Sequence, residues 1–321
     1  MSRSTGTTTS MTDAPGTSPI TLPADDMAHR RGHLRVAEER FAWLMISPSL
    51  LVLLLVGTAP LAALIIMGLY RIDLIGFRPN GFVSLENYRD MLQDDRFWGS
   101  VWTMLIYTFT SVFLQVVIGL TLSLALFRPL KGQGILRVAL LLPMILAPVA
   151  VGLTWRTLIL TPDYGIVDAF LQMFGLGPYP WLTHPTWALV SVILIHTWQW
   201  TPFAFLVFTA SLHAMPEEPF EAALIDGANG WQRFRDITLP LLRPALVVVI
   251  ILRIMIAFRA FDAIYSATGG GPGTATEILN LYAYRISFTS LKLGYGAALG
   301  TVLLLLTLVI SWVVFRLRQR A

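Results

Sequence analysis

The sequence predicts an all-α polytopic membrane protein with six transmembrane helices. Of its 321 residues 55% are hydrophobic and only 13% are charged, which is about half the ~25% usual in soluble domains. Six apolar segments reach the ~20 residues that a helix needs to cross a bilayer, and a helix satisfies its own backbone hydrogen bonds in lipid. We expect these spans at residues 41–69, 101–127, 135–160, 187–212, 245–266 and 295–315.

The distribution of positive charge predicts that both termini are cytoplasmic. Lys and Arg accumulate on the cytoplasmic side of membrane proteins. With the N-terminus inside, fourteen Lys and Arg fall in the inner segments and six in the outer ones, four of these in the first outer loop at 70–100. The net charge of +4 therefore reflects orientation in the membrane, and no nucleic-acid partner is expected. The absence of Cys excludes disulfides and thiolate sites.

The segments follow in order from this pattern. Residues 1–40 are rich in Ser, Thr, Pro and charge without an apolar period, so we expect a disordered cytoplasmic tail. The first transmembrane helix covers 41–69, and the other five lie within 101–315, which we expect to form the core of the protein. The string GGGPG at 269–273 is expected to end the fifth span on the outer side.

A strongly charged loop at 216–243 lies between the fourth and fifth spans. Pro216 suits the first turn of a helix, and Gly227 can end that helix in the left-handed conformation. Residues 231–237 can form a second short helix that Pro240 closes. Three acids stand where the helix dipole favours them: Glu217, Glu218 and Glu221. The loop therefore predicts two short helices joined at a glycine bend, presented to a cytoplasmic partner; a membrane-surface helix pair without a partner is the alternative.

The loop also carries a spaced motif. Glu-Ala-Ala at 221–223 is followed by Gly227, then by Ile237, then by Leu239-Pro240, and every specified position matches the EAA motif. From about residue 40 onward the chain resembles permease subunits of binding-protein-dependent ABC importers, in their carbohydrate-uptake, maltose-type branch. The resemblance implies the type I ABC importer permease fold with a cytoplasmic coupling-helix loop. The implied ATPase-coupling residues are Glu221, Ala222, Ala223, Asp226, Gly227, Ile237, Leu239 and Pro240.

The resemblance also implies partners. The chain carries no Walker motif, so it is expected to be no enzyme, with ATP and Mg bound by separate ATPase subunits and with no metal or cofactor of its own. The expected partners are a second homologous permease, two ATPase subunits, an extracytoplasmic solute-binding protein, a carbohydrate and membrane lipid. The expected location is the bacterial inner membrane.

Polar and aromatic residues in the fourth and fifth spans predict a substrate pathway, because polar groups inside spans usually face a cavity or one another. The resemblance implies that the residues of this pathway are Gln199, Trp200, Phe203, Arg253, Ile256, Ala257 and Ala260. Relatives have polar groups where Ala257 and Ala260 stand, so the pocket or the substrate must differ. Arg253 either meets an anionic substituent or is structural, and helix packing is the alternative for the Trp cluster. Arg259 and Asp262, three residues apart, are expected to form a structural ion pair.

The substrate class stays open in the sequence. A sugar, a polyol, glycerol phosphate and an acidic sugar all fit this pattern. An ion-coupled secondary transporter needs a membrane acid, and Asp262 is the only Asp or Glu within a predicted span. A membrane enzyme needs a catalytic constellation, and none assembles at the membrane face.

Overall fold

The computed structural model describes residues 24–75, 80–127 and 131–318. It divides into two compact units, Met1–Leu61 and Ala62–Ala321, and each is described by itself. The protein is 76% helical. Among the described residues, the only strands are the two-residue pair β1 (Tyr70–Arg71) and β2 (Gly81–Phe82), which run antiparallel.

Helix α1 (Ala24–Gly68) supplies the described part of the first unit and enters the second. It contains the predicted first span. It also includes residues 24–40 of the predicted tail, a segment rich in Ala, Glu and Arg, which are good helix formers. Residues 1–23 of the predicted tail lie outside the described residues.

Helices α3 (Asp95–Ala125) and α7 (Pro185–His213) form the most extensive helix pair of the second unit. The short helix α2 (Glu86–Leu92) precedes α3. The Asp94 side chain accepts a hydrogen bond from the backbone N–H of Arg96 and so caps α3. Pro185 occupies the first turn of α7, where its missing N–H has no cost.

The predicted third span is not one continuous helix. It consists of α4 (Gln133–Ile145), α5 (Pro148–Thr154) and the π-helical turn η1 (Trp155–Ile159), and the chain bends by 101° between its two halves. Pro148 holds the residue before it in extended conformation, with ψ 131° at Ala147. The predicted span at 135–160 is therefore divided by a sharp bend. Helix α6 (Ile166–Gln172) follows.

The predicted fifth span also differs at both ends. Helix α9 (Gly230–Arg233), the π-helical turn η2 (Phe234–Thr238) and α10 (Leu239–Ala257) run together from Gly230 to Ala257. A break at 258–261 then precedes α11 (Asp262–Thr268). Asn280 stabilises this break, because its amide donates to the carbonyls of Phe258 and Ala260 at 3.1 and 3.0 Å.

The chain ends with α12 (Leu279–Tyr284), η3 (Arg285–Thr289) and α13 (Leu293–Arg318). Within the described residues, five helices are long and apolar enough to cross a membrane, or six if the bent pair α4–α5 counts as one span. The predicted fold class, an all-α polytopic membrane protein, is confirmed.

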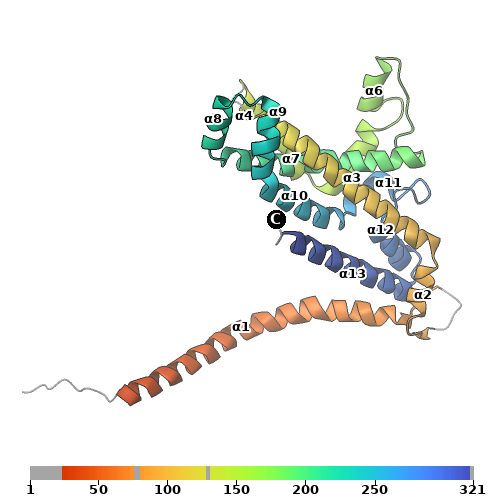
Figure 1. Ribbon diagram of the computed structural model, residues 1–321. Helices are drawn as coiled ribbons and strands as arrows, with labels where there is room; N and C mark the ends of the chain where they lie inside the picture. The colour runs from red at the N-terminus through yellow and green to blue at the C-terminus, as the bar shows by residue number, and fades with distance from the viewer. Residues whose placement is uncertain (1–23, 76–79, 128–130, 319–321) are drawn as a thin grey trace, which may run out of the picture. The chain divides into compact units, whose positions relative to one another are not determined.

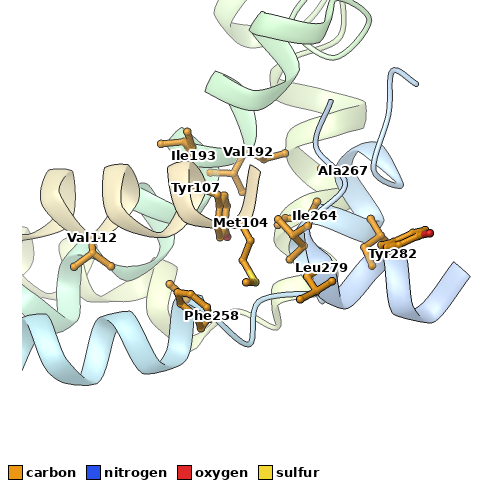
Figure 2. Close-up of a cluster of buried hydrophobic side chains, with 14 of the residues drawn as sticks. Met104, Tyr107, Val112, Val192, Ile193, Phe258, Ile264, Ala267, Leu279 and Tyr282 are labelled. Carbon is orange, nitrogen blue, oxygen red and sulfur yellow. The ribbon is translucent and has the colours of Figure 1, made fainter. Parts of the chain in front are cut away.

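A cluster of buried apolar side chains joins the helices of the second unit. Met104 and Tyr107 on α3 lie beside Val192 on α7 and Ile264 on α11 (Figure 2). Helices α8 (Glu218–Ile225) and α9 lie at the end of this unit opposite α2 and α12 (Figure 1). The fold therefore separates a charged loop at one end from a cluster of loops at the other.

A buried carboxylate stabilises the end of the unit where α2 and α12 lie. The Glu277 side chain is fully buried and accepts two hydrogen bonds from Arg96, at 2.6 and 2.8 Å, and one from Arg285 at 2.8 Å. Arg285 also donates to the carbonyl of Gly269. These contacts tie the glycine-rich loop after α11 to the start of α3.

Asp94 forms a second polar cluster at the same end. Its carboxylate accepts hydrogen bonds from the hydroxyls of Tyr282 and Tyr295 and from the backbone of Arg96. Burial raises the pKa of Asp94, but the hydrogen bonds from these hydroxyls and backbone amides outweigh burial and lower its pKa below the ordinary value.

Candidate coupling surface and transport cavity

Helix α8 presents the motif predicted from the sequence. Pro219, rather than the predicted Pro216, lies in its first turn. The helix ends where Gly227 adopts φ +77°. The N–H of Gly227 donates to the carbonyl of Leu224, and the N–H of Ala228 donates to that of Ala223. This is the Schellman arrangement of a left-handed cap, so the glycine bend is present as predicted.

A second signal, which the sequence prediction missed, starts α9. The backbone N–H of Gln232 donates to the Asn229 side chain at 2.9 Å, and the Gln232 side chain accepts from the Asn229 N–H at 2.7 Å. This reciprocal capping box is readable in the sequence as Asn-x-x-Gln. The helix then continues through η2, so Pro240 sits in the first turn of α10 and does not end a second short helix.

Apart from Gly227, the predicted coupling residues divide into two groups by exposure. Glu221, Ala222 and Asp226 are exposed, and Ala223 is half-buried. Leu224 and Ile225 beside them are 56% and 87% exposed. The other group, Ile237, Leu239 and Pro240, is half-buried on η2 and α10. Large apolar side chains next to exposed acids are typical of a protein-docking surface.

A cavity of about 260 Å³ lies between α3, α5, α7 and the break after α10. Four predicted pathway residues line it, namely Gln199, Trp200, Ile256 and Ala260. Three are not in its lining, namely Phe203 on α7 and the fully buried Arg253 and Ala257 on α10. The complete lining is Tyr107, Pro148, His196, Gln199, Trp200, Ile256, Arg259, Ala260, Phe261, Asp262 and Ala263. Tyr107 and Pro148 were missed, since they come from helices distant in sequence.

Arg253 is held by neutral groups. Its Nε donates to Gln115 Oε1 at 2.7 Å, and its Nη2 lies 3.3 Å from His196 Nε2. The Gln115 amide nitrogen lies 3.2 Å from the other ring nitrogen, Nδ1, so both ring nitrogens of His196 have polar neighbours. The guanidinium carbon lies 4.6 Å from the centre of the Trp200 ring, a cation–π contact. Arg253 therefore links α3, α7 and α10.

The predicted ion pair between Arg259 and Asp262 is not formed within the described part of the chain. Side chains three residues apart meet only on one continuous helix. Here α10 ends at Ala257 and α11 begins at Asp262, so no helix connects Arg259 to Asp262. Both side chains instead line the cavity. The described residues contain no group of three or more His, Asp and Glu suited to a metal ion.

A bundle of helices long and apolar enough to cross a membrane, with an exposed acidic loop at one end and a cavity within it, fits the permease class of transport protein. Residues 41–321 match the family described as "Binding-protein-dependent transport system inner membrane component", and the chain belongs to this family. It is accordingly an integral inner-membrane permease and not an enzyme.

Several relatives are similar over most of their length. The "Trehalose/maltose transport system permease protein MalF" of Thermococcus litoralis is 37% identical over 89% of this chain and 95% of its own. The "Sulfoquinovosyl glycerol transport system permease protein SmoG" of Agrobacterium fabrum is 34% identical over 88% and 92%. The "Trehalose transport system permease protein SugA" of Mycobacterium tuberculosis (strain H37Rv) is 31% identical over 88% and 90%.

A solved structure shares the fold. A chain in the crystal structure of a bacterial ABC transporter involved in the import of the acidic polysaccharide alginate superposes with a TM-score of 0.76. The alignment covers 90% of this chain and 99% of that chain at 21% identity. The ABC importer permease fold expected from the EAA motif is therefore present.

Proposed function

We propose that this chain is the permease subunit of an ATP-driven sugar importer and forms half of the translocation pathway. The observation that carries the sugar assignment is the 37% identity to a trehalose/maltose permease over most of both chains. A permease for a polyol, glycerol phosphate or an acidic sugar is the alternative within the same fold. An ion-coupled secondary transporter is disfavoured, because the exposed acidic helix α8 then has no role.

Coupling to the ATPase is proposed to run through α8. Glu221 would pair with a donor on the ATPase, and the small side chains of Ala222 and Ala223 permit close approach. The rigid caps at Gly227 and Asn229 fix the angle between α8 and α9. From Gly230 the helix runs unbroken for 28 residues, about 42 Å at 1.5 Å per residue. A displacement of α8 and α9 would therefore move Ile256 in the cavity wall.

The proposed partners follow from the same features. The cavity of about 260 Å³ is smaller than the ~300–1,000 Å³ of typical ligand pockets, which supports a second homologous permease that completes it. Two ATPase subunits, which bind ATP and Mg, would dock at the end of the unit where α8 lies. An extracytoplasmic binding protein would deliver the sugar at the opposite end, with both termini of this chain cytoplasmic.

A charge reversal tests the coupling role. In cells carrying the complete transporter, Glu221→Lys is expected to abolish ATP-dependent uptake of radiolabelled trehalose while the protein remains inserted. Glu218→Lys, at an exposed acid of the same helix outside the motif, is the matched control and should transport normally. Normal uptake by Glu221→Lys would count against docking at α8.

A second uptake experiment tests the dependence on ATP and the class of substrate. Uptake of maltose, trehalose, sorbitol and glycerol 3-phosphate is compared with and without ATP. Transport driven by an ion gradient in the absence of ATP would overturn the importer assignment. Exclusive uptake of sorbitol or glycerol 3-phosphate would replace sugar by the alternative substrate class.

A further inference from the structure

The cavity wall carries an excess of positive charge. Arg259 lines the cavity, and Arg253 lies behind it in contact with the Trp200 ring. Asp262 is the only carboxylate in the cavity lining. The exposed Arg259 and Asp262 offset each other in the lining, and the buried Arg253 adds a further positive charge beside the cavity.

The Arg253 charge has no counter-ion within the described part of the chain. Its side chain is fully buried, and its contacts are the neutral groups of Gln115, His196 and Trp200. A buried charge is normally paired, because removing it from water is costly. Charged residues inside membrane spans are usually functional for the same reason.

Three buried polar atoms around the cavity also lack hydrogen-bond partners among the described residues. They are Arg253 Nη1, Tyr107 Oη and Gln199 Oε1. Tyr107 and Gln199 are themselves fully buried, and both line the cavity. Because buried polar atoms are nearly always paired, two donors and one acceptor left free around one cavity indicate a polar ligand.

Arg259 completes the set. It is exposed and makes no side-chain hydrogen bond or ion pair with any other described residue. Its guanidinium is therefore free to make a bidentate contact, for which carboxylate and sulfonate groups have matching geometry.

We propose that the cavity receives the anionic group of a charged sugar, a carboxylate or sulfonate, with Arg253 and Arg259 providing the attraction. Arg259 contacts the anionic group directly. Arg253, on the other side of the Trp200 ring, attracts that group electrostatically without touching it. Tyr107 and Gln199 bind hydroxyls of the same ligand. A neutral sugar leaves the Arg253 charge uncompensated, whereas an anionic sugar neutralises it in surroundings where electrostatic attraction is strong. This inference rests on the proposed importer function and selects the acidic-sugar alternative as its substrate class.

Matched ligands test the proposal directly. The intact transporter, purified with its partner subunits in lipid nanodiscs, is titrated by calorimetry with sulfoquinovosyl glycerol, glucuronosyl glycerol and glucosyl glycerol. These differ at one substituent, which is a sulfonate, a carboxylate or a neutral hydroxymethyl. Both anionic ligands are expected to bind at least about tenfold more tightly than the neutral one, a factor that corresponds to 1.4 kcal/mol.

Substitutions of opposite sign separate an electrostatic role from a structural one. Arg259→Gln and Arg253→Gln should each lower the ratio of anionic to neutral affinity, and Asp262→Asn should raise it. Arg156→Gln, at an exposed arginine of η1 outside the cavity lining, should leave the ratio unchanged. If Arg253→Gln impairs assembly, the variants at the exposed Arg259 and Asp262 still decide the question.

The proposal is overturned if the three ligands bind equally, if none binds, or if Arg259→Gln and Asp262→Asn leave the ratio unchanged. Failure of the underlying function has a different signature, because ATP-dependent uptake of every sugar would then be absent. Import of trehalose without any preference for anions would refute this inference alone.

Discussion

Replacing Glu277 by Gln is expected to destabilise markedly the end of the second unit that lies opposite α8 and α9 (Figure 1). The substitution preserves shape but removes the charge that three hydrogen bonds from Arg96 and Arg285 share. Breaking a buried ion pair by removing one partner typically costs ~3–5 kcal/mol. The side chains of Arg96 and Arg285 are 40% and 33% exposed, so water recovers part of this loss. We therefore expect a loss of roughly 2–3 kcal/mol in the free energy of unfolding.

Denaturant titration in detergent micelles, followed by loss of the monodisperse peak in gel filtration, measures this change. Glu86→Gln is the matched control, because it removes the Arg71–Glu86 ion pair, whose side chains are 24% and 44% exposed. A surface pair of this kind contributes about 0–1 kcal/mol. Equal destabilisation by the two substitutions would refute the reasoning that burial of Glu277 determines its contribution.

Two further predictions concern the opposite ends of the unit. Gly227→Val should abolish ATP-coupled uptake without loss of insertion. A Cβ added at Gly227 meets nothing within 4 Å, so the penalty is backbone strain of about 1–2 kcal/mol at φ +77°. The control Gly227→Asn should retain uptake, because Asn tolerates this conformation. Wild-type uptake by Gly227→Val would show that the bend is dispensable. For Asp94, the lowered pKa in the folded state means that its carboxylate stabilises the protein above about pH 4 and that this contribution is lost as the pH falls further. The stability difference between wild type and Asp94→Asn, measured by thermal unfolding, should therefore shrink below pH 4; a difference independent of pH would contradict the role given to the Tyr282 and Tyr295 hydroxyls.

Local features of the chain were predictable where one short stretch of sequence determines them. Gly227 ends α8 because few other residues adopt its backbone conformation, and acids in the first turn of α8 match the helix dipole. The apolar spans follow from hydropathy alone. These signals concern neighbouring residues, and the EAA motif concentrates several of them in twenty positions.

The breaks in the third and fifth spans depend on residues far away in sequence. Pro143 and Pro148 both stand in apolar sequence, yet only one of them follows a break in the helix. Pro143 lies within α4, whereas Pro148 begins α5 after the break. The break is stabilised where Gln199, on another helix, donates to the carbonyl of Leu146 at 3.1 Å. Periodicity cannot reveal such a partner. The same holds for Arg253, because its contact Gln115 lies 138 residues earlier.

The two broken spans have a consequence for biosynthesis. The carbonyl of Leu146 meets its donor only when Gln199 has been synthesised, 53 residues later. The carbonyls of Phe258 and Ala260 meet Asn280 only 22 and 20 residues later. Exposed carbonyls are costly in hydrocarbon, so each broken segment should leave the insertion machinery together with the helix that completes it. The order of synthesis therefore pairs α4 and α5 with α7, and α10 with α12, before the bundle closes.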